Sequence, residues 1–302
     1  MTTLSHYTSL TGLEGIAKTG TLWATNFTEL NDTSEYFYAW EILQRDAIDY
    51  IMARIPSDLK RPDANLDAVM SQTIVAFRNV LRSSSGYGRL YMSSFARAKT
   101  EDQERRGILT LWERYTKHEG YCLQFDKSDV ERMLNLETMK GNYAAAGLSE
   151  VTYGVDKVTP EFKELCFQFG EWLLLKVAQQ YRDGRIDLNY SEQWAESYLI
   201  RSLLNYCGTH KDPCYEDERE VRIFVCPIDG ADARVFTGIA QRKAIRTAPS
   251  GKKYIALGEY WKPGLAPRRI IIGTRANLNV QSILAMYDRS PEVARADFPI
   301  AA

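Results

Sequence analysis

Residues 218–226 read Glu-Arg-Glu-Val-Arg-Ile-Phe-Val-Cys. From Val221 onward the run is β-branched and aromatic, which predicts a buried strand late in the chain. Because side chains alternate across a strand, Glu218, Glu220 and Arg222 should share one face, with the two carboxylates about 7 Å apart. Like charges this close disfavour full ionisation, and the nearby arginine favours it. The stretch therefore predicts either a site for acid–base chemistry or a solvated strand end whose charges protect an edge from aggregation.

The composition is that of an ordinary globular protein, with 45% hydrophobic and 25% charged residues among 302. The formal net charge of −1 provides no global attraction to nucleic acid or to anionic membranes, although local basic patches remain possible. The five cysteines and three histidines form no metal-binding pattern, so we expect no metal. We find no signal peptide and no apolar run long enough to span a membrane, so we expect a cytoplasmic protein.

The pattern of strands and helices predicts a mixed α+β fold with a sheet built from both ends of the chain. We expect one domain over residues 1–302, with helical insertions at about 36–85 and 160–207. Strands are predicted at 3–7, 21–25, 90–95, 120–125, 220–226, 233–237, 252–257 and 269–273. Helices are predicted near 10–17, 35–53, 66–81, 162–181 and 191–206, with a further one around Trp112.

An ordered set of short motifs resembles the bacterial DUF2971 family, from about residue 5 to residue 276. The motifs are His6-Tyr7-Thr8-Ser9, Leu22-Trp23-Ala24-Thr25, Leu30-Asn31-Asp32-x-x-Glu35, Ser93-Ser94-Phe95, Trp112-x-x-Tyr115, Gly120-Tyr121-Cys122, His210-Lys211, Glu218-x-Glu220-Val221-Arg222 and Ile270-Ile271-Ile272-Gly273. No single motif is specific, and the resemblance rests on their order. The family name itself implies no activity.

The same pattern is distantly similar to ADP-ribosyltransferases, which carry a His on an early strand and often a Glu-x-Glu on a late one. Here the corresponding residues are His6 and Glu218-x-Glu220. The resemblance implies that they line one cleft of a mixed, mainly antiparallel sheet of ADP-ribosyltransferase-like type. It also implies NAD as a substrate and a protein or nucleic-acid acceptor, or water, as the second substrate. A toxin or phage-defence setting follows from analogy alone.

Breaking the glycosidic bond of NAD passes through an oxocarbenium-like transition state, which a fixed carboxylate stabilises. The resemblance implies that Glu220 stabilises this cation and that Glu218 activates the acceptor. The expected cofactor-binding residues are His6, Tyr7, Thr8, Tyr91, Ser93 and Arg222. The expected substrate-binding residues are Asn31, Asp32, Glu35 and Lys211. Among these, His6 would donate to a ribose hydroxyl, and Arg222 or Lys211 would meet the pyrophosphate.

Each of these residues also fits a structural role. Asn31 to Glu35 has the chemistry of a helix-capping turn, and Ser93 could satisfy neighbouring backbone groups. The rival function is therefore a non-catalytic ligand- or protein-binding module on the same scaffold. A third alternative is a protein that acts on nucleic acid, against which the net charge argues mildly.

Overall fold

The computed structural model describes residues 2–30, 35–54, 66–82, 90–140, 143–183, 194–228, 243–262, 264–277 and 279–298. The predicted strand at 233–237 lies outside these residues. The chain divides into two compact units. Unit 1 contains residues 1–26, 91–151 and 214–302, and unit 2 contains residues 27–90 and 152–213. Unit 2 spans both predicted helical insertions, whereas the single-domain interpretation stays a prediction.

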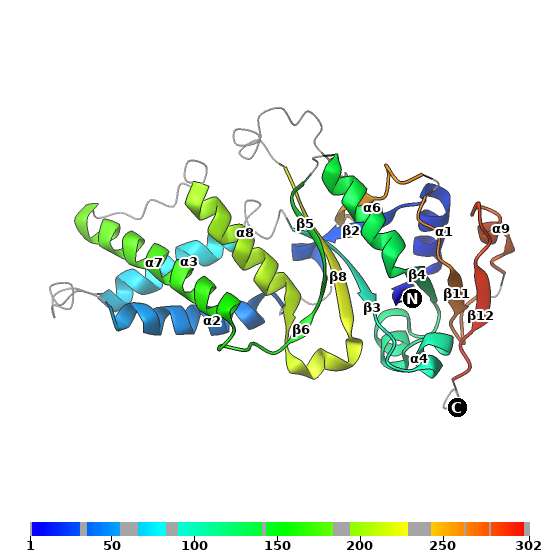
Figure 1. The fold of residues 1–302 in the computed structure, drawn as a ribbon, viewed down its shortest axis with the longest axis horizontal. Helices are drawn as coiled ribbons and strands as arrows, with labels where there is room; N and C mark the ends of the chain where they lie inside the picture. The colour runs from blue at the N-terminus through cyan, green and yellow to red at the C-terminus, as the bar shows by residue number, and fades with distance from the viewer. Residues whose placement is uncertain are drawn as a thin grey trace. The chain divides into compact units, whose positions relative to one another are not determined.

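Unit 1 contains the sheet (Figure 1). Its strands are β1 (Thr3–Thr8), β2 (Leu22–Asn26), β3 (Tyr91–Ala96), β4 (Tyr121–Asp126), β5 (Tyr143–Glu150), β8 (Glu220–Pro227), β9 (Arg246–Thr247), β10 (Lys253–Leu257), β11 (Arg269–Ile272) and β12 (Glu292–Arg295). Its helices are α1 (Leu10–Thr19), α4 (Glu101–Arg106), α5 (Leu109–Leu111), the π-helical turn η3 (Trp112–Thr116), α6 (Lys127–Met139) and α9 (Gln281–Leu284). The 3₁₀ turn η4 (Pro213–Glu218) leads into β8.

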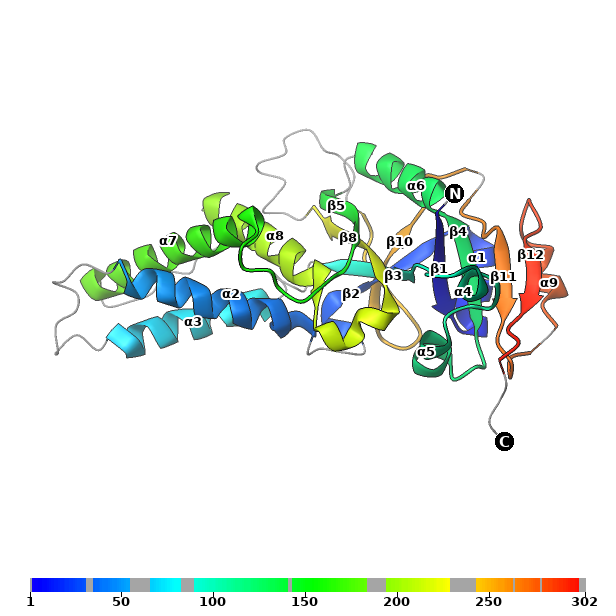
Figure 2. The same ribbon diagram turned by 60° about the horizontal axis from the view of Figure 1, so that its bottom comes forward.

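The strands follow the order β12-β11-β4-β1-β3-β2-β10-β9, and β8 pairs with both β3 and β5 (Figure 2). All pairs in this sheet are antiparallel except β11 with β12, which is parallel. The predicted α+β class with a mixed, mainly antiparallel sheet is therefore confirmed. The finer likeness to the ADP-ribosyltransferase sheet stays a prediction.

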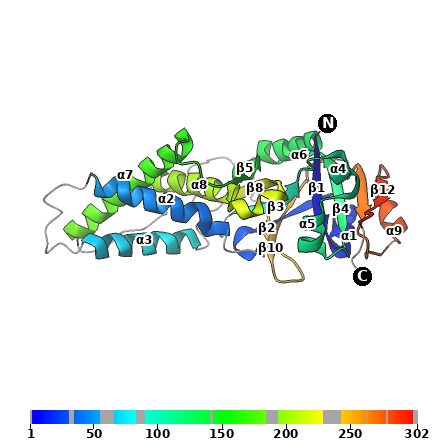
Figure 3. The same cartoon turned by 90° about the horizontal axis from the view of Figure 1, so that it is seen from below.

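Unit 2 is mainly helical, and its long helices lie side by side in Figure 3. Its elements are η1 (Phe27–Glu29), α2 (Glu35–Met52), α3 (Leu66–Arg82), β6 (Thr152–Tyr153), α7 (Pro160–Asp183), α8 (Trp194–Thr209) and β7 (His210–Lys211). The rings of Trp40 and Phe169 pack edge to face at 5.0 Å and join α2 to α7. Among the described residues, no helix combines the length and the apolar composition that crossing a bilayer requires.

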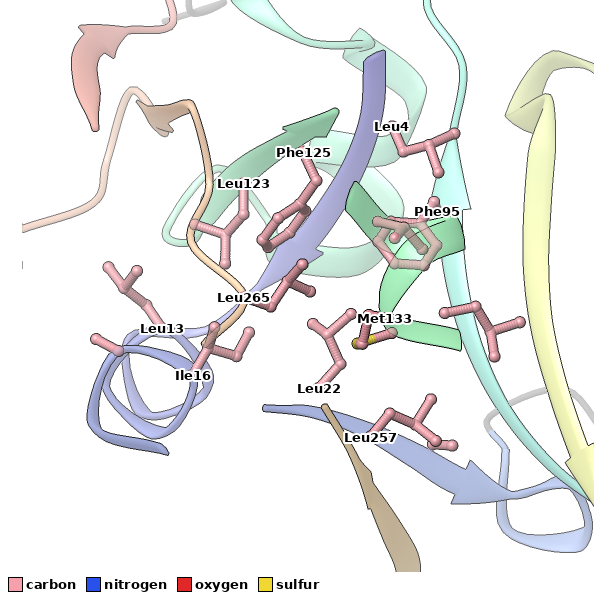
Figure 4. Packing of buried hydrophobic residues seen from close by; sticks show 14 of the residues in the cluster. Leu4, Leu13, Ile16, Leu22, Phe95, Leu123, Phe125, Met133, Leu257 and Leu265 are labelled. Carbon is pink, nitrogen blue, oxygen red and sulfur yellow. The ribbon is translucent and has the colours of Figure 1, made fainter. Parts of the chain in front are cut away.

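One face of the sheet in unit 1 carries the main hydrophobic core (Figure 4). Helix α1 contributes Leu13 and Ile16, and α6 contributes Met133. Helix α1 forms where the sequence predicts it, because Ser9 caps its first turn by accepting a hydrogen bond from the Gly12 N–H. Gly20 ends the helix in the left-handed conformation, with φ of 63°.

Two glycines of the quoted motifs explain how β4 and β11 meet. The Gly273 N–H donates to the Gly120 carbonyl oxygen at 2.9 Å. A Cβ atom on Gly273 would lie 2.4 Å from the His118 carbonyl oxygen and 2.8 Å from that of Gly120. Backbone atoms cannot move aside as a flexible side chain can, so only glycine fits at position 273 without a shift of the backbone.

We therefore expect Gly273→Ala to lower the free energy of unfolding by about 1–3 kcal/mol, the usual cost of overpacking. The matched control is Gly15→Ala in α1, where a Cβ meets nothing within 4 Å. That change should be neutral or should stabilise by up to about 1 kcal/mol, because alanine favours the helix. Urea denaturation of both variants measures the difference, and a Gly273→Ala protein as stable as the wild type would contradict the close backbone contact.

Candidate functional site

The late strand β8 holds a buried ion pair at its start. Arg222 Nε donates to Glu220 Oε1, and Arg222 Nη2 donates to Glu220 Oε2, both at 2.7 Å. The Arg222 residue is 2% exposed and the Glu220 residue is 6% exposed. The prediction that these two side chains share a face is confirmed. A two-pronged guanidinium contact fixes the carboxylate in one orientation as well as balancing its charge.

The pairing of β8 shows which residues surround this ion pair. Arg222 lies opposite Ser94 of β3 on one side and opposite Ser149 of β5 on the other. Glu220 lies opposite Ala96, which in turn lies opposite Ser5 of β1. Residues directly opposite each other share a face of the sheet.

We call the face that carries Glu220 and Arg222 the site face. Ser94 is exposed although it lies within the sheet, so solvent reaches the site face directly beside the buried pair.

Glu218 does not belong to the strand as predicted. It ends η4, and the following residue, Arg219, has a positive φ of 46°, so the alternation that would align Glu218 with Glu220 is interrupted. The Glu218 side chain is nonetheless buried and accepts hydrogen bonds from Arg114 and from the Tyr115 hydroxyl. Partial burial lowers the pKa of Arg114, but the hydrogen bond and charge of Glu218 outweigh this effect and raise that pKa above its ordinary value.

Arg114 and Tyr115 are two residues of this region that were missing from the predicted site. The guanidinium of Arg114 lies 5.1 Å from the centre of the Tyr215 ring, and its Nη1 contacts Glu218. The Arg114 side chain is 44% exposed, so it is a cation at the rim of the Glu218 carboxylate. Sequence reasoning could have found Arg114 through the Trp112-x-x-Tyr115 motif, because Arg114 lies within that motif.

Tyr7 lies on the site face, because it is two residues from Ser5 along β1. Its hydroxyl oxygen accepts from the Ile108 N–H at 2.6 Å, and its ring packs edge to face on Trp112 at 5.1 Å. Burial and the nearby Cys122 raise the pKa of Tyr7 well above its ordinary value, so the phenol stays protonated. Tyr7 is therefore a packed, neutral part of the site face.

His6 lies on the opposite face of the sheet from Glu220. Its ring is 5.7 Å from that of Phe95, which belongs to the main core together with Tyr91. The structure therefore does not bring the rings of His6 and Tyr91 to the face that holds Glu220. Ser93 is two residues from Phe95 along β3, and Thr8 is two residues from His6 along β1, so both lie on the same face as His6. Ser93 is buried, and its Oγ makes no hydrogen bond with the described residues.

His6 still contacts the site through the backbone. Its Nδ1 lies 2.9 Å from the carbonyl oxygen of Ser94, and a carbonyl can only accept, so Nδ1 carries the hydrogen. Burial lowers the pKa of His6, while the bond to Ser94 partly opposes this shift, so the ring is neutral at pH 7. In that state its other nitrogen, Nε2, accepts hydrogen bonds, whereas the predicted donation to a ribose hydroxyl would require the protonated ring.

The structure does not test the predicted substrate-binding residues. Asn31 and Asp32 fall outside the described residues, as does the side chain of Glu35, whose backbone begins α2. Lys211 lies in β7 of unit 2 and is buried. The roles predicted for these four residues stay predictions.

A family model matches the part of the chain that carries Glu218 and Glu220. It is that of DUF2971, a protein family of unknown function, and it covers residues 111–223. Over this stretch the match supports the predicted DUF2971 assignment. The match contains the motifs at Trp112, Gly120, His210 and Glu218, and it ends within β8. No curated protein and no solved structure matches the chain.

Burial of the Glu220–Arg222 pair predicts that a single substitution and a double substitution change stability unequally. Glu220→Gln removes the carboxylate that accepts two hydrogen bonds from the buried Arg222 guanidinium, which should cost about 3–5 kcal/mol of unfolding free energy. Replacing both residues, as Glu220→Met with Arg222→Met, should cost less than the single change, because both charges of the pair are removed together. Urea denaturation measures both variants.

The matched control for this comparison is Glu216→Gln, an exposed residue of η4, which should stay within about 0.5 kcal/mol of the wild type. If the double variant were less stable than Glu220→Gln alone, other contacts of these two residues would contribute more to stability than their pairing does.

The lowered pKa of His6 predicts a stability that falls in mild acid. Above the ordinary histidine pKa of about 6.5 the ring is neutral both folded and unfolded. Below it the unfolded chain binds the proton first, so the free energy of unfolding decreases as the pH falls toward the lower folded pKa. His6→Asn should make this loss of stability between pH 7 and pH 5 smaller, as measured by urea denaturation.

Some loss of stability in acid should remain in that variant, because burial also lowers the pKa of His210. An unchanged pH profile in the His6 variant would contradict the assignment.

Proposed function

We propose that unit 1 binds NAD on the site face and breaks the bond between nicotinamide and ribose, with Glu220 as the stabilising carboxylate. The observation that carries the proposal is the juxtaposition of a fixed, buried carboxylate and the solvent-exposed Ser94 on one face of the sheet. A carboxylate held in place in advance stabilises a developing cation without having to reorganise during the reaction.

The chemical step follows from the charges. The bond between C1′ of ribose and the pyridinium nitrogen breaks, and its electron pair neutralises the nicotinamide ring. Positive charge then develops at C1′, where Glu220 stabilises it. The oxygen of water or of an acceptor attacks C1′, and its proton passes to Glu218, which is buried against Arg114 and Tyr115.

The remaining predicted residues take modified roles in this proposal. Arg114, half-exposed at the rim, suits the pyrophosphate better than Arg222, because Arg222 is buried and directs two donors at Glu220. Tyr7 lies on the site face at the partly buried end of β1. His6 acts indirectly, because its hydrogen bond to Ser94 holds the backbone of β3 from the opposite face. The roles proposed for Thr8, Tyr91 and Ser93 are likewise supporting ones.

The test is release of nicotinamide from NAD by the purified protein, with protein, DNA or RNA acceptors added in turn. Glu220→Asp keeps the negative charge, but the side chain is one methylene shorter, so the carboxylate lies closer to the backbone. We expect it to lower the rate about 100-fold, because a misplacement of roughly 1 Å can cost that much. Glu220→Gln should lower the rate by about 100- to 1000-fold in protein that remains folded.

Glu218→Gln should reduce transfer to an acceptor more than hydrolysis, and the exposed control Glu216→Gln should match the wild type. Thermal unfolding of every variant separates loss of chemistry from loss of fold. Turnover that survives unchanged in folded Glu220→Gln protein would refute the mechanism.

The two-pronged Glu220–Arg222 contact also favours a second candidate, a non-catalytic binding module. A carboxylate neutralised by its own arginine resembles a structural ion pair. Saturable NAD binding without nicotinamide release would support this alternative. The proposed enzyme, acting on intracellular NAD, would be cytoplasmic, and the toxin or phage-defence setting is an extension of the same proposal. Growth arrest of bacteria that express the wild type, but not folded Glu220→Gln protein, would support that setting.

A further inference from the structure

Unit 1 has a second candidate site that involves none of the residues discussed above. A pocket of about 180 Å³ opens between the start of α6, the loop before β11 and the loop before β12. Its lining includes Asp126, Asp129, Trp261, Leu265, Arg268 and Arg289. Pockets for drug-sized ligands span about 300–1,000 Å³, so this one suits a smaller molecule.

The floor of the pocket is apolar and firmly held. Leu265 is buried in the main core and points toward Phe125 and Leu22 in Figure 4. The backbone N–H of Leu265 donates to the Gly20 carbonyl oxygen at 2.9 Å, which fixes the loop to the end of α1. Trp261 packs against the same core while part of its surface stays exposed. A ligand with an apolar body therefore finds a preformed surface here.

One end of the pocket carries excess negative charge. Asp126 Oδ1 is buried and accepts no hydrogen bond from the described residues, and the guanidinium of Arg268 is 3.9 Å away. Arg268 forms its close contact with Glu104 instead, so one guanidinium faces two carboxylates. Asp126 occupies the N-cap position of α6, yet its side chain makes no capping hydrogen bond. The carboxylate is therefore poorly neutralised, and because the Asp126 side chain is 27% exposed, a ligand donor can reach it from the pocket.

The other end carries a cation. Arg289 is exposed, and it has no ion pair with any residue of the described part of the chain. Arg289 and Asp126 line the same pocket, and no ion pair joins them. The remaining lining carboxylate, Asp129, is already paired with Arg132.

We propose that this pocket binds a free α-amino acid with an apolar side chain. The ammonium group would donate to the partly exposed Asp126 carboxylate, the carboxylate would meet the Arg289 guanidinium, and the side chain would lie on Trp261. A zwitterion satisfies both ends at once, whereas a simple cation or anion leaves one of them unmatched. The site is independent of NAD, and it would serve as a small-molecule binding site on the scaffold of unit 1.

The experiment is calorimetric titration of the whole protein with L-leucine and L-phenylalanine, compared with two blocked analogues. We expect at least one of the free amino acids to bind with a Kd of about 0.1–1 mM. N-acetyl-L-leucine lacks the ammonium group and L-leucinamide lacks the carboxylate, so each should bind at least about 10-fold more weakly than L-leucine. Saturable binding of neither free amino acid, or equal binding of the blocked analogues, would overturn the proposal.

Two variants assign the ends of the pocket. Asp126→Asn and Arg289→Gln should each weaken the binding of the free amino acid about 10-fold or more. Arg289→Gln should leave the already weak binding of L-leucinamide unchanged, because that ligand has no carboxylate to lose. The matched control is Asp288→Asn, the exposed neighbour of Arg289, which should bind as the wild type does. Unaltered affinity in both pocket variants would contradict the assignment even if the amino acid bound.

These binding measurements do not involve nicotinamide release, so their outcome is independent of the proposed NAD-cleaving activity.

Discussion

The hydrogen bonding of β8 on both of its edges is the constraint on which unit 1 depends. β8 lies between β3 and β5, and it is buried along most of its length. A strand in that position cannot present an isolated charge, because burying an uncompensated ion costs several kcal/mol. Arg222 and Glu220 satisfy this demand by pairing with each other two residues apart on the same face. The pairing that makes Glu220 a candidate catalytic group thus also compensates both charges inside the sheet.

The sequence predicted the site residues correctly where they belong to one regular strand. It failed where the backbone is irregular or where the result depends on how strands pair. Alternation placed Glu220 and Arg222 together, because both belong to a continuous strand. Glu218 departed from the pattern because Arg219 adopts the left-handed conformation, which local composition does not reveal. The separation of His6 from Glu220 by the sheet depends on the pairing of β1 with β3, which strand periodicity alone does not determine.

The fold shows the same division. Helix α1 and strand β8 were foreseen because their apolar residues recur at the proper spacing and their ends carry recognisable caps or breakers. Strand β5, with the sequence Tyr-Ala-Ala-Ala-Gly-Leu-Ser-Glu, was missed because alanine and glycine have low strand propensity. Its tight packing explains that composition, since a Cβ on Gly147 would lie 2.4 Å from the Phe224 ring. The contact of β5 with β8 therefore outweighed the low strand propensity of alanine and glycine.

The interleaving of the two units determines the order in which the chain can fold during synthesis. β3 ends at Ala96, but the strand that covers its edge begins only at Glu220, after both segments of unit 2 have been made. At roughly 5–20 residues per second, the growing chain carries the unpaired edge of β3 for several seconds. An uncovered edge of this kind is a template for wrong pairing, so the newly made protein is most prone to aggregate during that interval. Segments 27–90 and 152–213, in contrast, are complete before β8 emerges, which allows unit 2 to fold first.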